Sequence, residues 1–306
     1  MAKANDKAKA KAKAKSAEKP AKGEGETKAA KPRKGAGGAE PKGFRGYLTR
    51  TRYPLYSILF VVPLALFYEF GVVKVNEPII ATHGSEMRVT ADKIIRDALG
   101  WFLDLCGVHG AAARPGDFGV ASVIVLILVL LGWQIACRKG WDVRPLTLLG
   151  VAGEAVLFGF LWFLAAYYVI DPLAKMTIEN ESARWLTSGA FREIVFAAGA
   201  GVYEEFLFRM LLVWVIAVVV AGITSLEWDP SRFIAVLLAA VVFSAHHHIG
   251  LSGEPFTWMM FAYRAVAGAF FGIVYYLRGF GVAVGCHAMY NVCVYFFISP
   301  QYLFGG

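Results

Sequence analysis

The sequence predicts an all-α, polytopic transmembrane helix bundle of seven to eight helices, preceded by a disordered basic tail. Of the 306 residues, 57% are hydrophobic, and the mean hydropathy is +0.52. Soluble domains are only about 45–50% apolar. The apolar residues are also concentrated in runs of about 20, long enough to cross a hydrocarbon core of about 30 Å. A soluble globular domain is therefore a poor description of this chain.

The basic charge is confined to the first 45 residues. They contain twelve Lys, two Arg and five acidic residues, a net charge of +9, whereas the rest of the chain is near −1. The Lys-Ala repeats with interspersed Gly, Pro and Glu cannot bury enough apolar surface to fold. No apolar stretch near Met1 indicates a secretory signal. We expect a cytoplasmic tail that contacts anionic lipid, with nucleic-acid binding as the less favoured alternative.

Seven apolar runs follow the tail. They cover about 54–73, 118–136, 147–170, 192–224, 232–249, 256–277 and 280–299. The fourth run is too long for one straight span, so a broken helix, an interfacial helix plus a span, and two short helices all stay open. We expect three parts: the tail at 1–45, N-terminal transmembrane helices at 46–189, and a C-terminal core at 190–300.

Loop charges predict the orientation of the spans, because cytoplasmic loops carry an excess of Lys and Arg. The basic loop Arg138–Arg144 is expected inside, and Gly250–Pro255, which has no Lys or Arg, outside. The segment of about 74–117 is then extracytoplasmic. Its helical apolar pattern indicates an amphipathic helix on the membrane surface, formed by Ile94, Ile95, Leu99, Phe102 and Leu103. We expect a protein of the plasma (inner) membrane with a cytoplasmic N-terminus.

Charged residues inside apolar helices are costly and usually functional. In the stretch Glu204-Glu205-Phe-Leu-Phe-Arg209, Glu205 and Arg209 are four residues apart and can pair on one helix face. Glu204 is rotated away by about 100°, so its carboxylate is left for acid–base chemistry. A buried ion pair that only joins helices would explain one glutamate and not both.

Two further clusters contain histidine. In Phe243-Ser-Ala-His-His-His248, three consecutive histidines point in three directions, and a polar helix end is the alternative reading. In His287-Ala-Met-Tyr-Asn291, two side chains share one face, and hydrogen bonding between helices is the alternative. Together with the glutamates, these clusters supply a base, a water-orienting group and oxyanion donors, the parts that peptide hydrolysis requires.

The three motifs, in this order, resemble the CPBP family of intramembrane proteases, also called the type II CAAX prenyl endopeptidase or Abi family. The family patterns EExxxR, FxxxH and HxxxN read here as Glu204 to Arg209, Phe243 to His247, and His287 to Asn291. The resemblance covers about 190–300.

The resemblance implies a peptidase, of a family often described as metalloproteases, that cleaves a membrane-embedded or lipidated substrate. Glu204 would activate water and His247 would help to position it. His287 and Asn291 would stabilise the oxyanion, and the Glu205–Arg209 pair would support the site. The substrate stays open among a prenylated C-terminal peptide, a bacteriocin-related or signalling peptide, and a C-terminal sorting signal.

We expect no metal cofactor, with zinc as the alternative. The sequence has no HExxH, the motif that places two zinc-ligating histidines and a base on one helix. If zinc is bound, its expected ligands are Glu204, His247 and His287. The choice of His247 over His246 and His248 is based on the FxxxH spacing.

The two histidines of the motifs are expected at different depths. His247 lies about 15 residues into its run and His287 about 7 into its own, which corresponds to about 12 Å if the spans are parallel. Tilted or offset helices are needed to bring both to one site.

Two alternative functions stay open. One is a rhomboid-like serine protease, because Gly250-Leu-Ser252-Gly253 matches GxSG and Ser252 could act with His287. That reading leaves both glutamates unexplained. The other is a non-catalytic membrane scaffold or immunity protein, or a transporter, because intramembrane carboxylates and histidines also serve proton relays. The lack of matching half-repeats disfavours a transporter.

Overall fold

The computed structural model describes residues 43–83, 91–107, 121–169, 189–249 and 255–304. The chain divides into two units, Met1–Glu40 and Pro41–Gly306. All described residues belong to the second unit. The predicted tail therefore lies almost entirely outside the described residues, and its disorder and its lipid contacts stay predictions.

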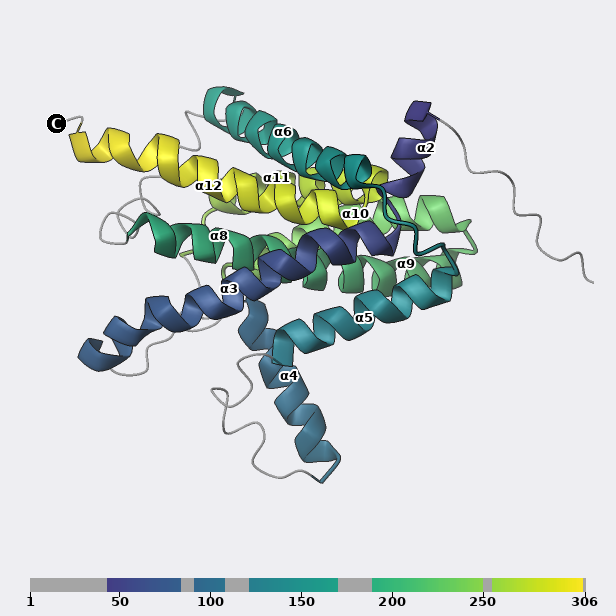
Figure 1. Cartoon of the computed structure of the whole chain (residues 1–306), viewed down its shortest axis with the longest axis horizontal. Helices are drawn as coiled ribbons and strands as arrows, with labels where there is room; N and C mark the ends of the chain where they lie inside the picture. The colour runs from purple at the N-terminus through teal and green to yellow at the C-terminus, as the bar shows by residue number, and fades with distance from the viewer. Residues whose placement is uncertain (1–42, 84–90, 108–120, 170–188, 250–254, 305–306) are drawn as a thin grey trace, which may run out of the picture. The chain divides into compact units, whose positions relative to one another are not determined.

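Every regular element in the described residues is a helix, which confirms the all-α prediction (Figure 1). Six helical segments are long and apolar enough to cross a membrane: Pro54–Val75, Pro145–Tyr168, Ala190–Thr224, Trp228–His246, Trp258–Arg278 and Phe280–Phe297. A shorter apolar helix covers Ala121–Cys137. The chain is thus an integral membrane protein built as a polytopic helix bundle.

In chain order, the described elements are α2 (Gly43–Arg50), α3 (Pro54–His83), α4 (Ala91–Leu105), α5 (Ala121–Cys137), α6 (Pro145–Val169), α8 (Ala190–Glu204), η2 (Glu205–Leu212), α9 (Val213–Thr224), α10 (Trp228–His246), α11 (Trp258–Arg278) and α12 (Phe280–Phe304). The long fourth run is one continuous helix, because η2 joins α8 to α9 in π-helical geometry.

Helix α4 occupies the segment in which an amphipathic helix is expected. Ile95 packs in the core formed by α3, α5 and α8. Trp101, Phe102 and Leu105 are exposed. The apolar face of α4 is therefore buried at Ile95 and exposed nearer the C-terminal end of the helix. Phe102 lies on the same face as Ile95, two turns later, and is exposed there.

Helix α12 packs against α3, α6, α8 and α11 and so lies next to the helix that carries the two glutamates. Two glycines permit the close approach. A Cβ atom at Gly201 on α8 would lie 2.7 Å from the Val284 carbonyl oxygen, and one at Gly159 on α6 would lie 2.6 Å from the Cys286 carbonyl oxygen. Small residues at helix interfaces allow such backbone contacts in membranes. The position of α12 is therefore set on two sides.

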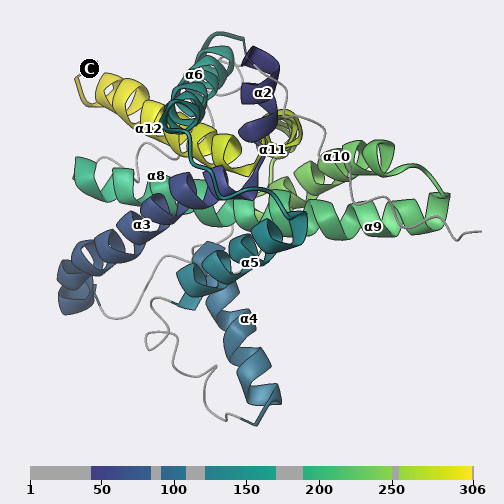
Figure 2. The ribbon, with the colours of Figure 1, turned by 45° about the vertical axis from the view of Figure 1, so that its right-hand side comes forward.

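The second motif is held by α9 and α11. Helices α9 and α10 lie side by side, and α10 also packs along α11 (Figure 2). A Cβ atom at Gly272 on α11 would lie 2.6 Å from a methyl carbon of Val236, and Gly268 faces Phe243. The GxxxG of α11 therefore faces α10 and brings α11 against the motif.

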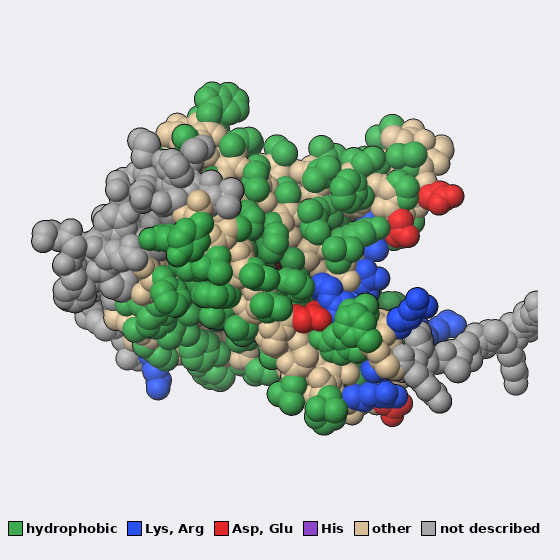
Figure 3. All heavy atoms as spheres, turned by 90° about the horizontal axis from the view of Figure 1, so that it is seen from above, with side chains coloured by type: hydrophobic (Ala, Val, Ile, Leu, Met, Phe, Trp, Pro, Cys, Tyr) green, Lys and Arg blue, Asp and Glu red, His purple; other side chains and the backbone are tan. Residues whose placement is uncertain are grey.

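A polar network joins helices α2, α6 and α11 to one another. Arg278 donates two hydrogen bonds of 2.7 Å to the carboxylate of Glu154 on α6, and Tyr47 of α2 donates to the same carboxylate at 2.9 Å. Arg52 donates to two carbonyl oxygens in the last turn of α11. Figure 3 shows hydrophobic side chains over much of the visible face and Lys and Arg side chains mostly toward one end. This distribution is typical of helices that cross a membrane.

Candidate active site

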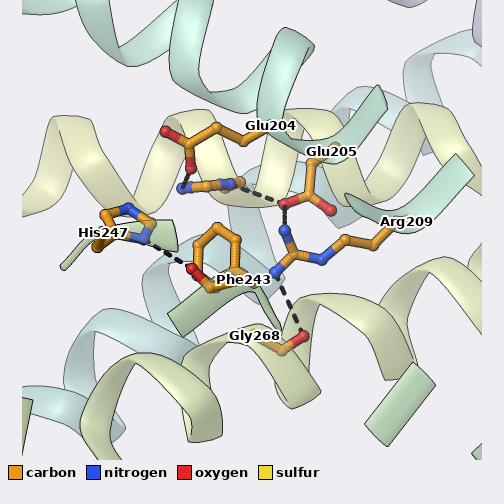
Figure 4. A network of polar contacts seen from close by, with 7 residues as sticks. Glu204, Glu205, Arg209, Phe243, His247 and Gly268 are labelled. Carbon is orange, nitrogen blue, oxygen red and sulfur yellow. Dashed lines mark hydrogen bonds and ion pairs between the residues drawn. The ribbon is translucent and has the colours of Figure 1, made fainter. Parts of the chain in front are cut away.

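The first motif lies where the long helix changes from α-helical to π-helical geometry. Helix α8 ends at Glu204, and η2 begins at Glu205. A π-helical turn holds more residues than an α-helical turn and is found frequently at functional sites. The two adjacent glutamates leave the helix in different directions, and each meets different neighbours (Figure 4).

Glu205 is the buried member of the pair. Its side chain is 0% exposed, and its Oε1 lies 3.1 Å from Nη1 of Arg209, which is 2% exposed. The same oxygen lies 2.8 Å from Nδ1 of His287. Since the ion-paired carboxylate can only accept, Nδ1 of His287 donates in this bond. Glu205 is thus fixed by a cation and by an imidazole.

Glu204 faces the other nitrogen of the same imidazole. Its Oε2 lies 3.8 Å from Nε2 of His287, and its side chain is 18% exposed. This distance is too long for a hydrogen bond. The imidazole therefore lies between two carboxylates, of which one is buried and bonded to it and the other is partly exposed and not bonded to it.

The ring of His287 is held flat against an aromatic side chain. The Phe271 ring of α11 stacks on it, with centroids 4.4 Å apart and an angle of 13° between the planes. The hydrogen bond to Glu205 fixes the rotation of the ring in that plane. The direction of Nε2 is therefore set by two contacts. The sequence reasoning did not single out Phe271, and no spacing rule relates it to the three motifs.

Arg209 is enclosed by the other helices of the site. Its Nη2 donates to the Gly268 carbonyl oxygen of α11 at 3.3 Å, and its guanidinium lies 4.2 Å from the centroid of the Phe243 ring. A cation over an aromatic face is attracted by the ring quadrupole. The phenylalanine of the FxxxH motif thus has a packing role, and Arg209 connects α10 and α11 to Glu205.

His247 lies at the end of α10, beside Phe243. Its Nδ1 lies 2.8 Å from the Phe243 carbonyl oxygen. Because a carbonyl oxygen only accepts, Nδ1 carries the proton and the other ring nitrogen, Nε2, is a hydrogen-bond acceptor. Figure 4 shows the His247 ring on the side of the cluster where the Glu204 carboxylate points, and Glu205 and Arg209 on the other side.

The neighbouring histidines meet other side chains. The His246 ring contacts Phe208 at 5.3 Å, and the His248 ring contacts Phe256 at 5.2 Å. The three consecutive histidines therefore have different principal neighbours, as their helical spacing predicts.

The expected difference in depth between the two motif histidines is bridged by one side chain. The Phe243 ring lies 6.2 Å from the His287 ring and 4.8 Å from the His247 ring. The Phe243 ring therefore neighbours both imidazole rings, and both histidines border one cluster.

Asn291 and Ser252 are the remaining residues that the sequence predicts at a catalytic site. Asn291 follows His287 by one turn on α12 and is partly buried. Within the described part of the chain, no hydrogen bond or ion pair joins it to Glu204, Glu205 or His287. Ser252, the nucleophile of the serine-protease alternative, lies outside the described residues.

Two carboxylates of the N-terminal helices, one partly buried and one buried, were missed. Glu154 of α6 pairs with Arg278, and Glu69 of α3 accepts hydrogen bonds from Ser122 and Tyr203. Each is a charge inside an apolar run, so the rule that pointed to Glu204 would have identified them as well.

The residues expected to hold zinc do not assemble into a metal site. Among the described residues, no three or more His, Cys, Asp or Glu side chains are arranged to hold a metal ion. Of the expected ligands, His287 is bonded through Nδ1 to Glu205, and its Nε2 lies 3.8 Å from Oε2 of Glu204.

Residues 186–293 match the family model described as Rce1-like: type II CAAX prenyl endopeptidase Rce1-like. This segment contains all three motifs and every residue of the cluster around His287. A search of curated proteins and a search of solved structures found no match. The family match agrees with the resemblance that the motifs carry. Residues 186–293 therefore match an Rce1-like domain, which is consistent with the CPBP family.

Proposed function

We propose that this protein is an intramembrane endopeptidase that hydrolyses a peptide bond of a membrane-associated or lipidated substrate with a water molecule activated by Glu204. The family match supports a CAAX-type intramembrane endopeptidase. The observation that carries the glutamate mechanism is the imidazole of His287 between a buried glutamate and a partly exposed one. Only the second can reach a water molecule and a substrate.

Glu204 would act as the general base and then as the general acid. Its carboxylate takes one proton from water, and the resulting hydroxide adds to the carbonyl carbon of the substrate. The same proton then passes from Glu204 to the departing amine as the C–N bond breaks. His247 supports this step because its unprotonated Nε2 can accept a hydrogen bond from the other O–H group of the water molecule and so orient it.

His287 and Asn291 would stabilise the oxyanion of the tetrahedral intermediate. His287 already donates from Nδ1 to Glu205, so donation to an oxyanion requires a second proton at Nε2. The side-chain amide of Asn291, one turn along the same helix face, is the second donor.

Glu205 and Arg209 would support the site without contacting the substrate. Glu205 is fully buried and fixes the ring rotation of His287. Arg209 compensates the charge of Glu205 and ties it to the Gly268 carbonyl oxygen and the Phe243 ring. Partner groups of this kind hold a catalytic imidazole in one orientation.

The helices that carry these residues are all candidate membrane spans, so the substrate must reach the site from the bilayer. A lipidated C-terminal peptide agrees best with the family match. The plasma (inner) membrane with the N-terminus in the cytoplasm is proposed as its location, based on the basic tail and loop.

The decisive assay is proteolysis of a prenylated C-terminal peptide by the purified full-length protein in lipid nanodiscs. The variants are Glu204→Gln and His287→Ala, with Glu227→Gln as the matched control, since Glu227 is an exposed glutamate between α9 and α10. Loss of one general base is expected to lower the rate about 10²- to 10⁴-fold. Cleavage at the wild-type rate by both site variants would favour a scaffold, immunity or transport role.

Two additional arms separate the remaining alternatives. A zinc chelator is expected to leave the rate unchanged; a loss that added zinc restores would show that a metal takes part. Ser252→Ala is expected to cleave like the wild type, and its inactivation would favour the serine mechanism.

A further inference from the structure

Helix α3 places a buried carboxylate against the helix that carries Glu204 and Glu205. Glu69 is 5% exposed, and its Oε1 accepts hydrogen bonds from Tyr203 of α8 at 2.5 Å and from Ser122 of α5 at 2.6 Å. Tyr203 and Ser122 are buried as well. Side chains from α3, α5 and α8 are therefore joined by hydrogen bonds at one oxygen atom.

This hydrogen-bonded group joins helices outside the segment that the family model matches to a helix inside it. Glu69 and Ser122 precede residue 186, whereas Tyr203 lies within the matched segment. A carboxylate in an apolar span is energetically costly and usually has a function. The proposed chemistry does not require Glu69 to contact the substrate, so we infer that Glu69 acts through Tyr203.

Tyr203 directly precedes Glu204. Adjacent residues on a helix are rotated by about 100°, so the tyrosine can face α3 while Glu204 faces α12. A rotation of the helix about its axis would move both side chains together. Fixing the hydroxyl group of Tyr203 therefore fixes the direction of the Glu204 carboxylate, and the π-helical geometry begins one residue later, at Glu205.

Two glycines of α8 near Tyr203 make close contacts with neighbouring helices. Tyr68, next to Glu69 on α3, packs so closely over Gly199 that a Cβ atom there would lie 2.2 Å from its ring. On the opposite side, Gly201 lies against the α12 backbone. Small residues let the helices approach closely. The hydrogen bond from Tyr203 to Glu69 is a directional contact on the α3 side of this helix, whereas Glu205 and Arg209 make directional contacts with α12 and α11.

We propose that Glu69 is a positioning residue of the peptidase site: through the Tyr203 hydroxyl group it fixes the rotation of the α8–η2 helix and thereby aims Glu204 at His287. The inference depends on the proposed function, because it assigns Glu204 the role of the base. It also gives the N-terminal helices a part in catalysis.

The test compares kcat and KM of the full-length protein on the same prenylated peptide. Tyr203→Phe removes only the hydroxyl group and is expected to lower kcat about 10- to 100-fold, with KM changed less than about twofold, because a small misplacement of a catalytic group has effects of this size. Glu69→Leu is expected to do the same. Glu69→Gln keeps an accepting oxygen and is expected to restore kcat to within about threefold of the wild type.

Ser122→Ala is the matched control. It removes the other hydrogen bond to the same oxygen of Glu69 but leaves the bond from Tyr203, so kcat is expected to stay near the wild-type value. Each variant is also tested for thermal unfolding, so that a folding defect is recognised at the assay temperature.

Three outcomes would overturn the inference: a wild-type kcat for Tyr203→Phe, an equal loss for Ser122→Ala, or a Glu69→Gln variant as slow as Glu69→Leu. Failure of the proposed function looks different, since Glu204→Gln would then cleave like the wild type. A dead Glu204→Gln together with a fully active Tyr203→Phe rejects the positioning role alone.

Discussion

The buried ion pair beneath His287 makes a quantitative prediction about stability. Replacing Arg209 with Met removes the cation but keeps most of the side-chain volume. Glu205 is then left 0% exposed, with His287 as its remaining partner among the described side chains. Removing one partner of a buried pair costs about 3–5 kcal/mol because the other charge is left uncompensated. We therefore expect the free energy of unfolding to fall by about that amount.

Reversible unfolding of the purified protein by SDS in mixed micelles, followed by tryptophan fluorescence, measures this change. The matched control is Arg232→Met, because Arg232 is partly exposed and lies 3.9 Å from the exposed Asp229. A partly exposed pair of this kind contributes only about 0–1 kcal/mol, and the contact of Arg232 with the Tyr276 ring adds about 0.5–1 kcal/mol.

A double-mutant cycle isolates the pair. Glu205→Gln in the Arg209→Met background removes the uncompensated charge, so the double variant should be more stable than the sum of the single losses predicts, by about 2 kcal/mol. The reasoning is refuted if Arg209→Met costs no more than Arg232→Met, or if the two losses simply add.

The remaining predictions concern helix contact, histidine choice and pH. Gly201→Ala should lower proteolysis strongly, because its Cβ would lie 2.7 Å from the Val284 carbonyl oxygen and displace α12; Gly222→Ala, with open space around it, should be active, and equal activity of the two would contradict the packing argument. His247→Gln should slow cleavage about 10-fold or more, whereas an equal effect of His246→Gln would remove the preference for His247. Burial, followed by the hydrogen bond to Glu154, raises the pKa of Tyr47 from 10.0 to about 12. Its contribution to stability is therefore complete below pH 10 and lost as the pH rises through about 12, so alkaline unfolding should be less steep in Tyr47→Phe.

Local periodicity accounts for the parts of the site that were predicted from the sequence. The four-residue spacing indicated that Glu205 and Arg209 can pair, and in the structure Oε1 of Glu205 lies 3.1 Å from Nη1 of Arg209. The apolar runs predicted an all-helical membrane protein, which is confirmed. Both inferences need only the geometry of one helix.

The rest depends on contacts between helices. Spacing along α8 could not show that one imidazole lies between both glutamates, or that Phe271 stacks on that imidazole. The expected depth difference between His247 and His287 assumed straight, parallel spans, whereas Phe243 bridges the two rings. The π-helical geometry of η2 also has no signal in the pattern of apolar residues. The roles of the four site residues stay predictions until they are measured.

The central claim is that Glu204, and not its buried neighbour, activates the water molecule. The most direct test is the single-turnover rate of peptide cleavage by Glu204→Gln. The affinity for the substrate is measured on the same nanodisc preparation. We predict that binding is kept while cleavage falls at least about 100-fold. Cleavage at the wild-type rate by a folded Glu204→Gln protein would contradict the account.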